Sequence, residues 1–264
     1  MGFIEYKKSN LHFSKAGKGG KHLLLFHGFG QDHRVFKNWV DALQDEYTCY
    51  SFDLYFHGSS IWQSREALEK EDWQKILQQF LQQEGISQFS VAGFSMGGKF
   101  AIATYQLFHQ QITDLILLAP DGIKTSFWYS LATYPIAIRA LFKSMILHPN
   151  RLHSFTIVLR KLRLVDAGLL RFAESQMNSE EKRRRVYYSW VYFRHLKFNQ
   201  NHIAALVNQN KVNFCLITGK YDKVVSTQNM ASFLQKVKFV RADEINSGHQ
   251  ELIIRVDPKV YLSR

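Results

Sequence analysis

The apolar residues of this chain fall into short continuous runs, separated by longer segments with a helical spacing of apolar positions. The runs lie at residues 22–26, 47–52, 89–92, 113–119 and 212–218. A strand that is covered on both faces shows such a run, because neither of its faces meets water. Two of the intervening segments, 34–43 and 66–83, have the amphipathic pattern of surface helices. This alternation predicts an α/β protein with a doubly wound, mostly parallel sheet.

A hairpin precedes the alternation, and a further strand–helix repeat follows it. Residues 3–6 and 11–14 have the pattern of two antiparallel strands that turn at Lys8-Ser9-Asn10. Near the other end of the chain, we expect a helix at 226–235, a strand at 237–241 and a helix from Gln250 onward. The predicted fold is therefore a parallel sheet with an antiparallel hairpin at its amino-terminal end.

The regular alternation is interrupted between residues 122 and 200, where the sequence is helical in character, aromatic and basic. This stretch holds 14 lysines and arginines and 4 acidic residues, a net charge of +10. The rest of the chain holds 20 lysines and arginines and 18 acidic residues, a net charge of +2. We predict that residues 1–121 and 201–264 form the α/β core and that residues 122–200 form a helical cap inserted into it.

The composition is that of a globular protein with a substantial core. The 264 residues are 46% hydrophobic, which suits one large α/β domain with an insertion. Cys49 and Cys215 both lie in apolar runs, which favours two buried thiols over a disulfide. The first eight residues include Glu5 and have no long apolar run, so they do not resemble a secretion signal. No stretch approaches the roughly 18 uninterrupted apolar residues of a membrane span, and we expect a cytoplasmic protein.

Residues 93–97 read Gly-Phe-Ser-Met-Gly and join the 89–92 run to a helical segment rich in small residues. In a strand–turn–helix setting, this G-x-S-x-G sequence indicates a sharp turn that exposes a nucleophile, because side chains at the two glycines would collide with the neighbouring strand and helix. The turn would place Ser95 at the carboxyl end of the sheet, beside the free N–H groups of a helix N-terminus. An ordinary strand–helix connection is the alternative.

Four further segments accompany this turn. They are His27-Gly-Phe-Gly30, Asp53 with His57-Gly-Ser-Ser60, Thr218-Gly-Lys-Tyr-Asp222 and Ser247-Gly-His249. Together with the Ser95 turn, they resemble the α/β-hydrolase superfamily in order and spacing over about residues 20–255. The likeness is to the cap-bearing branch of esterases, thioesterases and C–C hydrolases, and it implies a serine hydrolase with a Ser-His-Asp triad.

Three residues are the predicted catalytic set. Ser95 is a weak nucleophile unless an imidazole takes its proton, and His249 follows the last predicted strand, where the family places this base. Asp222 follows the 212–218 strand and would hold the tautomer of His249. Asp121 is the alternative acid, because some members of the superfamily place the acid after the strand that precedes the cap. Asp222 and His249 could also be ordinary turn or loop residues.

By the same resemblance, two backbone N–H groups are expected to stabilise the oxyanion of a tetrahedral intermediate, those of Phe29 and Met96. His27 is expected to orient the loop that carries Phe29 rather than to act as a second base. We predict no metal site and no cofactor, because the sequence contains no H-E-x-x-H, Walker or C-x-x-C pattern and a serine mechanism needs neither.

The insertion is rich in aromatic residues, namely Phe127, Trp128, Tyr129, Tyr134, Phe142, Phe155, Phe172, Tyr187, Tyr188, Trp190, Tyr192 and Phe193. We expect most of them to pack the cap and a few to line an apolar acyl pocket. The basic runs at 160–163 and 182–185 have the pattern of a solvated helix face. They could instead bind an acidic carrier, such as an acyl carrier protein or coenzyme A. Contact with a membrane surface is less favoured, and no nucleic-acid reading motif accompanies the charge.

The leading hypothesis is a serine hydrolase that cleaves an ester or thioester of a small or acyl-chain substrate through an acyl-enzyme. One alternative is a C–C bond hydrolase or a non-hydrolytic lyase that uses the same triad. Another is a non-catalytic module that binds a ligand or a partner through the basic insertion.

Overall fold

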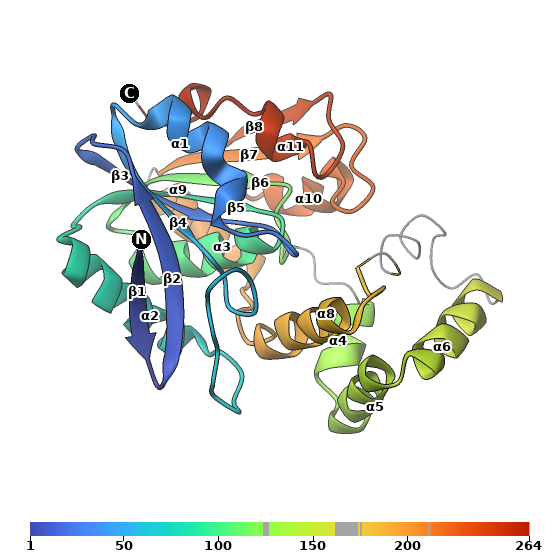
Figure 1. The fold of residues 1–264 in the computed structure, drawn as a ribbon. Helices are drawn as coiled ribbons and strands as arrows, with labels where there is room; N and C mark the ends of the chain where they lie inside the picture. The colour runs from blue at the N-terminus through green and yellow to red at the C-terminus, as the bar shows by residue number, and fades with distance from the viewer. Residues whose placement is uncertain (124–126, 162–173, 175, 211, 264) are drawn as a thin grey trace. The chain divides into compact units, whose positions relative to one another are not determined.

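The computed structural model describes residues 1–123, 127–161, 174, 176–210 and 212–263 (Figure 1). The chain divides into two compact units, one formed by residues 1–124 and 196–264 and the other by residues 125–195. We call them the core unit and the inserted unit. Each is described separately below.

The sheet of the core unit has eight strands. They are β1 (Gly2–Tyr6), β2 (Ser9–Ala16), β3 (Lys21–Phe26), β4 (Tyr47–Phe52), β5 (Phe89–Phe94), β6 (Ile112–Leu118), β7 (Asn213–Gly219) and β8 (Arg241–Ile245). Their order in the sheet is β1-β2-β4-β3-β5-β6-β7-β8. The β1–β2 and β2–β4 pairs are antiparallel, and every later pair is parallel. The predicted fold class, with its amino-terminal antiparallel hairpin, is confirmed.

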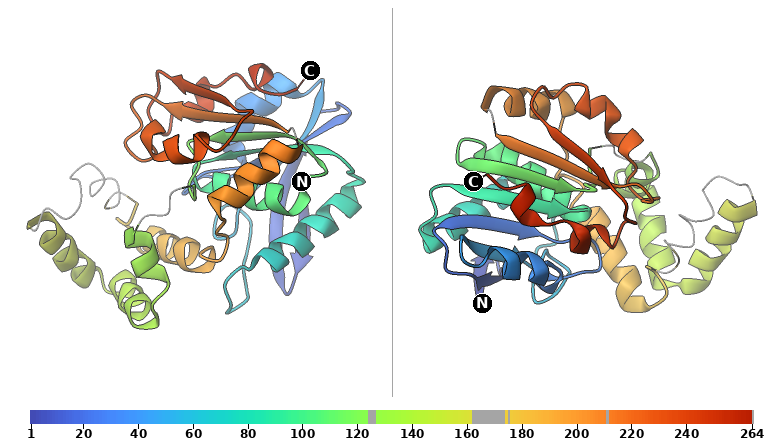
Figure 2. Two further views of the ribbon diagram at one scale, coloured as in Figure 1. Left: turned by 180° about the vertical axis from the view of Figure 1, so that it is seen from behind. Right: turned by 90° about the horizontal axis from the view of Figure 1, so that it is seen from above.

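Helices cover both faces of this sheet (Figures 1 and 2). One face carries η1 (His33–Phe36), α1 (Lys37–Leu43), α11 (Leu252–Arg255) and η2 (Pro258–Val260). The other face carries α2 (Lys70–Glu84), α3 (Met96–Phe108) and α9 (Gln200–Asn210). Helix α10 (Thr227–Leu234) lies next to α9. Indole hydrogen bonds join helices on each face. Trp39 donates to the carbonyl of Ile253 at 3.0 Å, and Trp73 donates to the Thr104 hydroxyl at 3.0 Å.

The middle of the sheet is fully covered, which explains the continuous apolar runs. Every residue of β4 and β5 is buried. A strand in this position contributes side chains to the packing on both faces, so an alternation of polar and apolar residues would place polar groups in the core. The carboxyl ends of β3 to β8 all lie at one edge of the sheet, because these strands are parallel.

Three predicted elements differ from the observed ones. The hairpin turns at Lys7 and Lys8 rather than at Lys8-Ser9-Asn10, since Ser9 and Asn10 already pair with β1 as part of β2. The helix expected at 66–83 begins at Lys70, because Glu69 and Asp72 form a capping box that fixes its start. The strand expected at 237–241 is wrong, since β8 covers Arg241–Ile245. β8 is an edge strand with exposed polar residues, and the apolar run before it contains Phe239, which is 59% exposed. At a sheet edge, hydrophobicity is therefore a poor guide to where a strand begins.

The inserted unit is helical over its described residues. It contains α4 (Phe127–Thr133), α5 (Ile136–Leu147), α6 (Pro149–Lys161) and α8 (Glu180–Tyr192). Aromatic rings join these helices, with Phe142 5.5 Å from Tyr187 and 5.9 Å from Trp190 between ring centroids. Among the aromatic and basic residues noted in the sequence, Phe172 and Arg163 lie outside the described residues, as do the side chains of Phe127 and Trp128.

Within the part of the chain that the structure describes, no helix combines the length and the apolar character that a membrane-crossing helix needs.

The first prediction concerns the close approach of α3 to β3. A Cβ atom at Gly97 would lie 1.9 Å from the carbonyl oxygen of Phe26, which is backbone and has little freedom to move away. In a helix, alanine is normally more stabilising than glycine by about 1 kcal/mol. Here we expect Gly97→Ala to lower the free energy of unfolding by about 3 kcal/mol or more, because the overlap forces the backbones of α3 and β3 apart.

The measurement is urea unfolding followed by circular dichroism. Gly20→Ala is the matched control, because a Cβ atom at Gly20 meets nothing within 4 Å, and it should change stability by no more than about 0.5 kcal/mol. Equal stability of the Gly97→Ala variant and the wild type would show that the close approach is not a constraint.

Candidate active site

Ser95 lies between the end of β5 and the start of α3, in a backbone conformation that L-amino acids rarely adopt. Its φ is 51° and its ψ is −117°. Three backbone hydrogen bonds hold this conformation. The Ser95 N–H donates to the Leu118 carbonyl at 2.9 Å, and its carbonyl accepts from the N–H groups of Gly98 and Asp121, each at 2.8 Å. Such strain persists only where the surroundings impose it, and it is typical of functional sites.

The two glycines of the turn allow this geometry. A Cβ atom at Gly93 would lie 2.4 Å from the Gly97 carbonyl oxygen, and one at Gly97 would overlap the backbone of Phe26. The sequence Gly-x-Ser-x-Gly is thus required by contact between the turn, the helix and the neighbouring strand, as the sequence pattern suggested.

The structure brings Ser95, His249 and Asp222 into one hydrogen-bonded chain. His249 Nε2 lies 2.9 Å from Ser95 Oγ, and His249 Nδ1 lies 2.6 Å from Asp222 Oδ2. A carboxylate accepts only, so Nδ1 carries a proton in this pair and neutral Nε2 is free to accept the proton of the serine hydroxyl. This arrangement gives the hydroxyl a base within hydrogen-bonding distance.

Asp222 is fixed more tightly than a typical loop aspartate. Its side chain is fully buried, and its Oδ1 accepts from the N–H groups of Val224 at 2.7 Å and Val225 at 2.9 Å. The loop after β7 is tied to the loop after β8 by the Tyr221 N–H, which donates to the Ser247 carbonyl at 3.0 Å. Because β7 and β8 are parallel neighbours, the loops that follow them place Asp222 and His249 side by side at the carboxyl edge of the sheet.

The alternative acid, Asp121, has a different partner. Its carboxylate lies 3.4 Å from Lys99 Nζ, an ammonium group on α3 that is largely buried. Its backbone N–H supports Ser95, as described above. Asp121 thus lies next to the turn, but its carboxylate is paired with Lys99, whereas the carboxylate that meets His249 is that of Asp222.

The loop after β3 is held by the imidazole of His27. His27 Nδ1 donates to the Gly28 carbonyl at 2.7 Å, and Nε2 accepts from the Leu54 N–H at 2.9 Å. Complete burial lowers the pKa of His27 from 6.5 to about 4. His27 is therefore neutral near pH 7, with both ring nitrogens occupied by backbone groups.

Gln31 completes this loop and was not identified from the sequence. The side-chain oxygen of Gln31 accepts from the Gly28 N–H at 3.0 Å, and the backbone N–H of Gln31 donates to the Gly28 carbonyl at 3.3 Å. Because the peptide that joins Gly28 to Phe29 is trans and planar, the N–H of Phe29 points away from that carbonyl. A glutamine three residues after a glycine is a weak signal, so only the folded loop reveals this contact.

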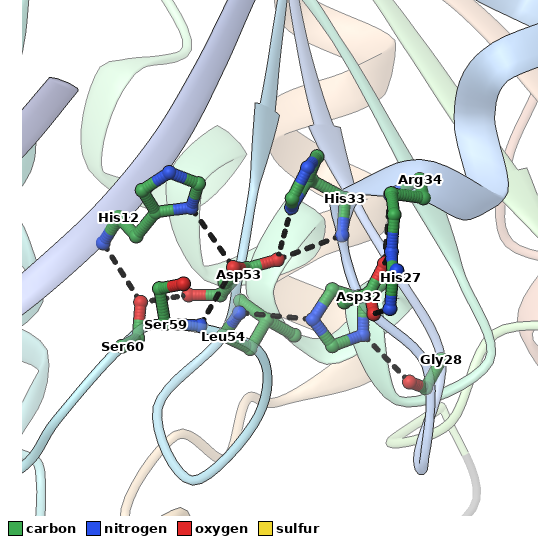
Figure 3. A network of polar contacts seen from close by, with 10 residues as sticks. All are labelled: His12, His27, Gly28, Asp32, His33, Arg34, Asp53, Leu54, Ser59 and Ser60. Carbon is green, nitrogen blue, oxygen red and sulfur yellow. Dashed lines mark hydrogen bonds and ion pairs between the residues drawn. The ribbon is translucent and has the colours of Figure 1, made fainter. Parts of the chain in front are cut away.

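Asp53 is the centre of a second polar network, which joins β2, β4 and the start of η1 (Figure 3). Its Oδ2 accepts from His12 Nδ1 and the Ser59 N–H, each at 2.8 Å. Its Oδ1 accepts from the N–H of His33 at 2.7 Å and from His33 Nδ1 at 2.8 Å. Burial alone would raise the pKa of Asp53, but the hydrogen bonds from Ser59 and His33 outweigh it and lower the pKa below its ordinary value.

Among the described residues, His12, His33 and Asp53 are the group that could hold a metal ion, since their ligand atoms lie within 4.8 Å of one another. Both oxygens of Asp53 already accept two hydrogen bonds each. A cation bound to these oxygens would have to displace the imidazole and backbone donors that hold them. The donor set suits a structural hydrogen-bond centre that anchors the loops after β3 and β4.

The cysteines offer no competing nucleophile. Cys49 and Cys215 are free and buried. Burial raises the pKa of Cys49 to about 12 and that of Cys215 to about 11. Since the thiolate is the reactive form, both thiols are inert near pH 7.

The chain belongs to the alpha/beta hydrolase fold family, whose model matches residues 21–250. The resemblance to the α/β-hydrolase superfamily seen in the sequence is therefore confirmed. One relative is the dihydrolipoyllysine-residue acetyltransferase component of an acetoin cleaving system from Pseudomonas putida, 32% identical over 42% of this chain and 30% of that protein. Another is a pimeloyl-[acyl-carrier protein] methyl ester esterase from Legionella pneumophila, 32% identical over 35% of this chain and 34% of that protein. The match thus spans about a third of the length of these relatives.

A thermophilic esterase from Thermogutta terrifontis is similar over almost the whole chain. The TM-score is 0.66 with 17% sequence identity, over 93% of this chain and 88% of that one. At this identity the likeness establishes a common fold.

The second prediction follows from the buried neutral state of His27. In the unfolded chain this imidazole binds a proton near pH 6.5, and in the folded chain only near pH 4. Its contribution to stability is therefore complete above pH 6.5 and is lost as the pH falls from 6.5 through 4. The loss over this window should reach about 3 kcal/mol.

The measurement is the free energy of unfolding in urea at several pH values, for the wild type and for His27→Gln. Glutamine does not titrate, so the difference in stability between the two proteins should shrink by about 3 kcal/mol across the window. Parallel pH profiles would contradict the neutral, buried assignment of His27.

Proposed function

We propose that this protein is a hydrolase that cleaves an ester or thioester of an acyl substrate through an acyl-enzyme formed on Ser95. The observation that carries the proposal is the continuous chain from Ser95 Oγ to His249 Nε2 at 2.9 Å and from His249 Nδ1 to Asp222 Oδ2 at 2.6 Å. The strained backbone of Ser95 adds support, because it presents the hydroxyl at the end of the sheet.

In the acylation step, Ser95 Oγ attacks the carbonyl carbon while its proton passes to His249 Nε2. Asp222 accepts from Nδ1 throughout and stabilises the imidazolium that forms. The carbonyl oxygen becomes an oxyanion. As the tetrahedral intermediate collapses, the bond to the leaving alcohol or thiol breaks, and that group departs with the proton from Nε2.

The oxyanion would be stabilised by the N–H groups of Phe29 and Met96. Met96 opens α3, where N–H groups have no acceptor within the helix. The peptide that carries the N–H of Phe29 is held by its other end, because the Gly28 carbonyl accepts from His27 Nδ1 and from the Gln31 backbone N–H. One such donor is typically worth about 10²–10³ in rate. Deacylation repeats these reaction steps with water as the nucleophile. The water loses a proton to His249 as it attacks the acyl-enzyme, and collapse of the second tetrahedral intermediate releases the acid and regenerates the Ser95 hydroxyl with that proton.

The substrate class follows from the relatives and the charge of the insertion. The Legionella relative is named for an ester carried on an acyl carrier protein, and the stretch 122–200 of this chain has a net charge of +10. We propose that this stretch acts as the cap of the active site. An acyl group on an acidic carrier, such as an acyl carrier protein or coenzyme A, would suit its charge.

The third prediction separates the two candidate acids. Asp222→Asn should lower kcat for a p-nitrophenyl ester by about 10⁴, because asparagine favours the wrong tautomer of His249. Asp121→Asn should change kcat by less than about tenfold, since Asp121 contacts Lys99 rather than His249. Both variants remove one negative charge, so they are matched in charge and size.

The measurement is steady-state hydrolysis of the ester by the two variants and the wild type, with circular dichroism to confirm folding. A large loss for Asp121→Asn together with a small loss for Asp222→Asn would reverse the assignment of the acid. Turnover that neither variant changes would contradict the proposed mechanism.

A further inference from the structure

An open apolar groove lies between α5 and α6 of the inserted unit. Its volume is about 420 Å³, and its accessible wall is almost entirely apolar. The lining residues are Leu141, Met145, Asn150, Arg151, Ser154 and Phe155. All of them belong to two helices that are consecutive in the chain, so the groove is a feature of the inserted unit by itself.

Large apolar side chains in and beside the groove are exposed. Leu141 is 55% exposed, Phe155 40% and Val158 49%. On α6, Arg151, Phe155 and Val158 recur at i, i+4 and i+7, which places them on one face of the helix. Contiguous exposed apolar surface of this kind is costly in water and marks a contact surface.

The same two helices carry positive charge only. Residues 136–161 contain five lysines and arginines and no aspartate or glutamate. The cations are Arg139, Lys143, Arg151, Arg160 and Lys161, of which Arg160 is paired with Glu174 at 2.9 Å. Lys143 and Lys161 are exposed, and Arg151 lines the groove itself. The occupant of this surface must therefore offer both hydrocarbon and negative charge.

We propose that the α5–α6 surface docks the protein on an anionic lipid bilayer. Helices with exposed apolar residues beside lysines and arginines lie in the membrane interface, with the apolar side chains among the acyl chains and the cations at the headgroup phosphates. A second copy of the chain fits less well, because it would bring the same five cations against these. The proposal uses residues of α5 and α6 only, and Ser95 belongs to the other unit of the chain, so it does not depend on the catalytic mechanism.

The fourth prediction is tested by flotation of the full chain with two kinds of vesicle, phosphatidylcholine alone and equal parts of phosphatidylcholine and phosphatidylglycerol. The wild type should float with the anionic vesicles only, and less so at high salt. The double variant Leu141→Ser with Phe155→Ser should lose at least about tenfold in partitioning. Phe239→Ser, which removes a similarly exposed ring from the core unit, should bind as the wild type does.

A second pair of changes, Lys143→Glu and Lys161→Glu, tests the charge without altering the groove and should also abolish binding to the anionic vesicles. Circular dichroism should show that all these variants fold as the wild type does. The proposal is overturned if the wild type fails to bind anionic vesicles, or if it binds and neither set of changes weakens binding. It is also overturned if light scattering shows that the wild type is a dimer and that the Leu141→Ser, Phe155→Ser double variant is a monomer. Binding of an acyl carrier protein, without binding of the vesicles, would overturn it as well.

Discussion

The active-site arrangement depends on one close backbone contact, that between Gly97 of α3 and the carbonyl of Phe26 at the end of β3. Ser95, which joins β5 to α3 two residues before Gly97, has a positive φ. Backbone hydrogen bonds hold this conformation: the Ser95 N–H donates to the Leu118 carbonyl on the neighbouring strand, and the Ser95 carbonyl accepts from the Asp121 N–H beyond that strand. A strained residue of this kind persists because the surrounding core is rigid and fully buried.

The other site residues gather at Ser95 because the sheet is parallel. Strands β7 and β8 end at the same edge as β5, so the loops that follow them place Asp222 and His249 next to Ser95. Buried polar groups then fix the loops at that edge. His27 stays neutral and bonds to backbone on both sides, and Asp53 stays ionised and accepts four hydrogen bonds. Both ring nitrogens of His27 and both carboxylate oxygens of Asp53 have hydrogen-bond partners, which is the condition under which a buried polar group stabilises a fold.

The sequence was most informative where one physical requirement acts alone. Continuous apolar runs located the buried strands, and the two glycines of the turn located Ser95, since both patterns reflect local packing. The sequence was least informative where contacts are distant or weakly constrained. β8 was misplaced because an edge strand needs no apolar run. The roles of Gln31 and the His12–Asp53 contact arise from loops that meet only after folding. The exposure of Phe155 likewise depends on how α5 and α6 pack.

The most direct test of the central claim, that Ser95 is an activated nucleophile, is the intact mass of the protein after incubation with a fluorophosphonate. The account predicts one covalent adduct on the wild type, no adduct on Ser95→Ala, and greatly slowed labelling of His249→Ala, because the hydroxyl is unreactive without its base. A folded wild-type protein that gains no adduct would contradict the claim. So would an adduct that persists when Ser95 is replaced.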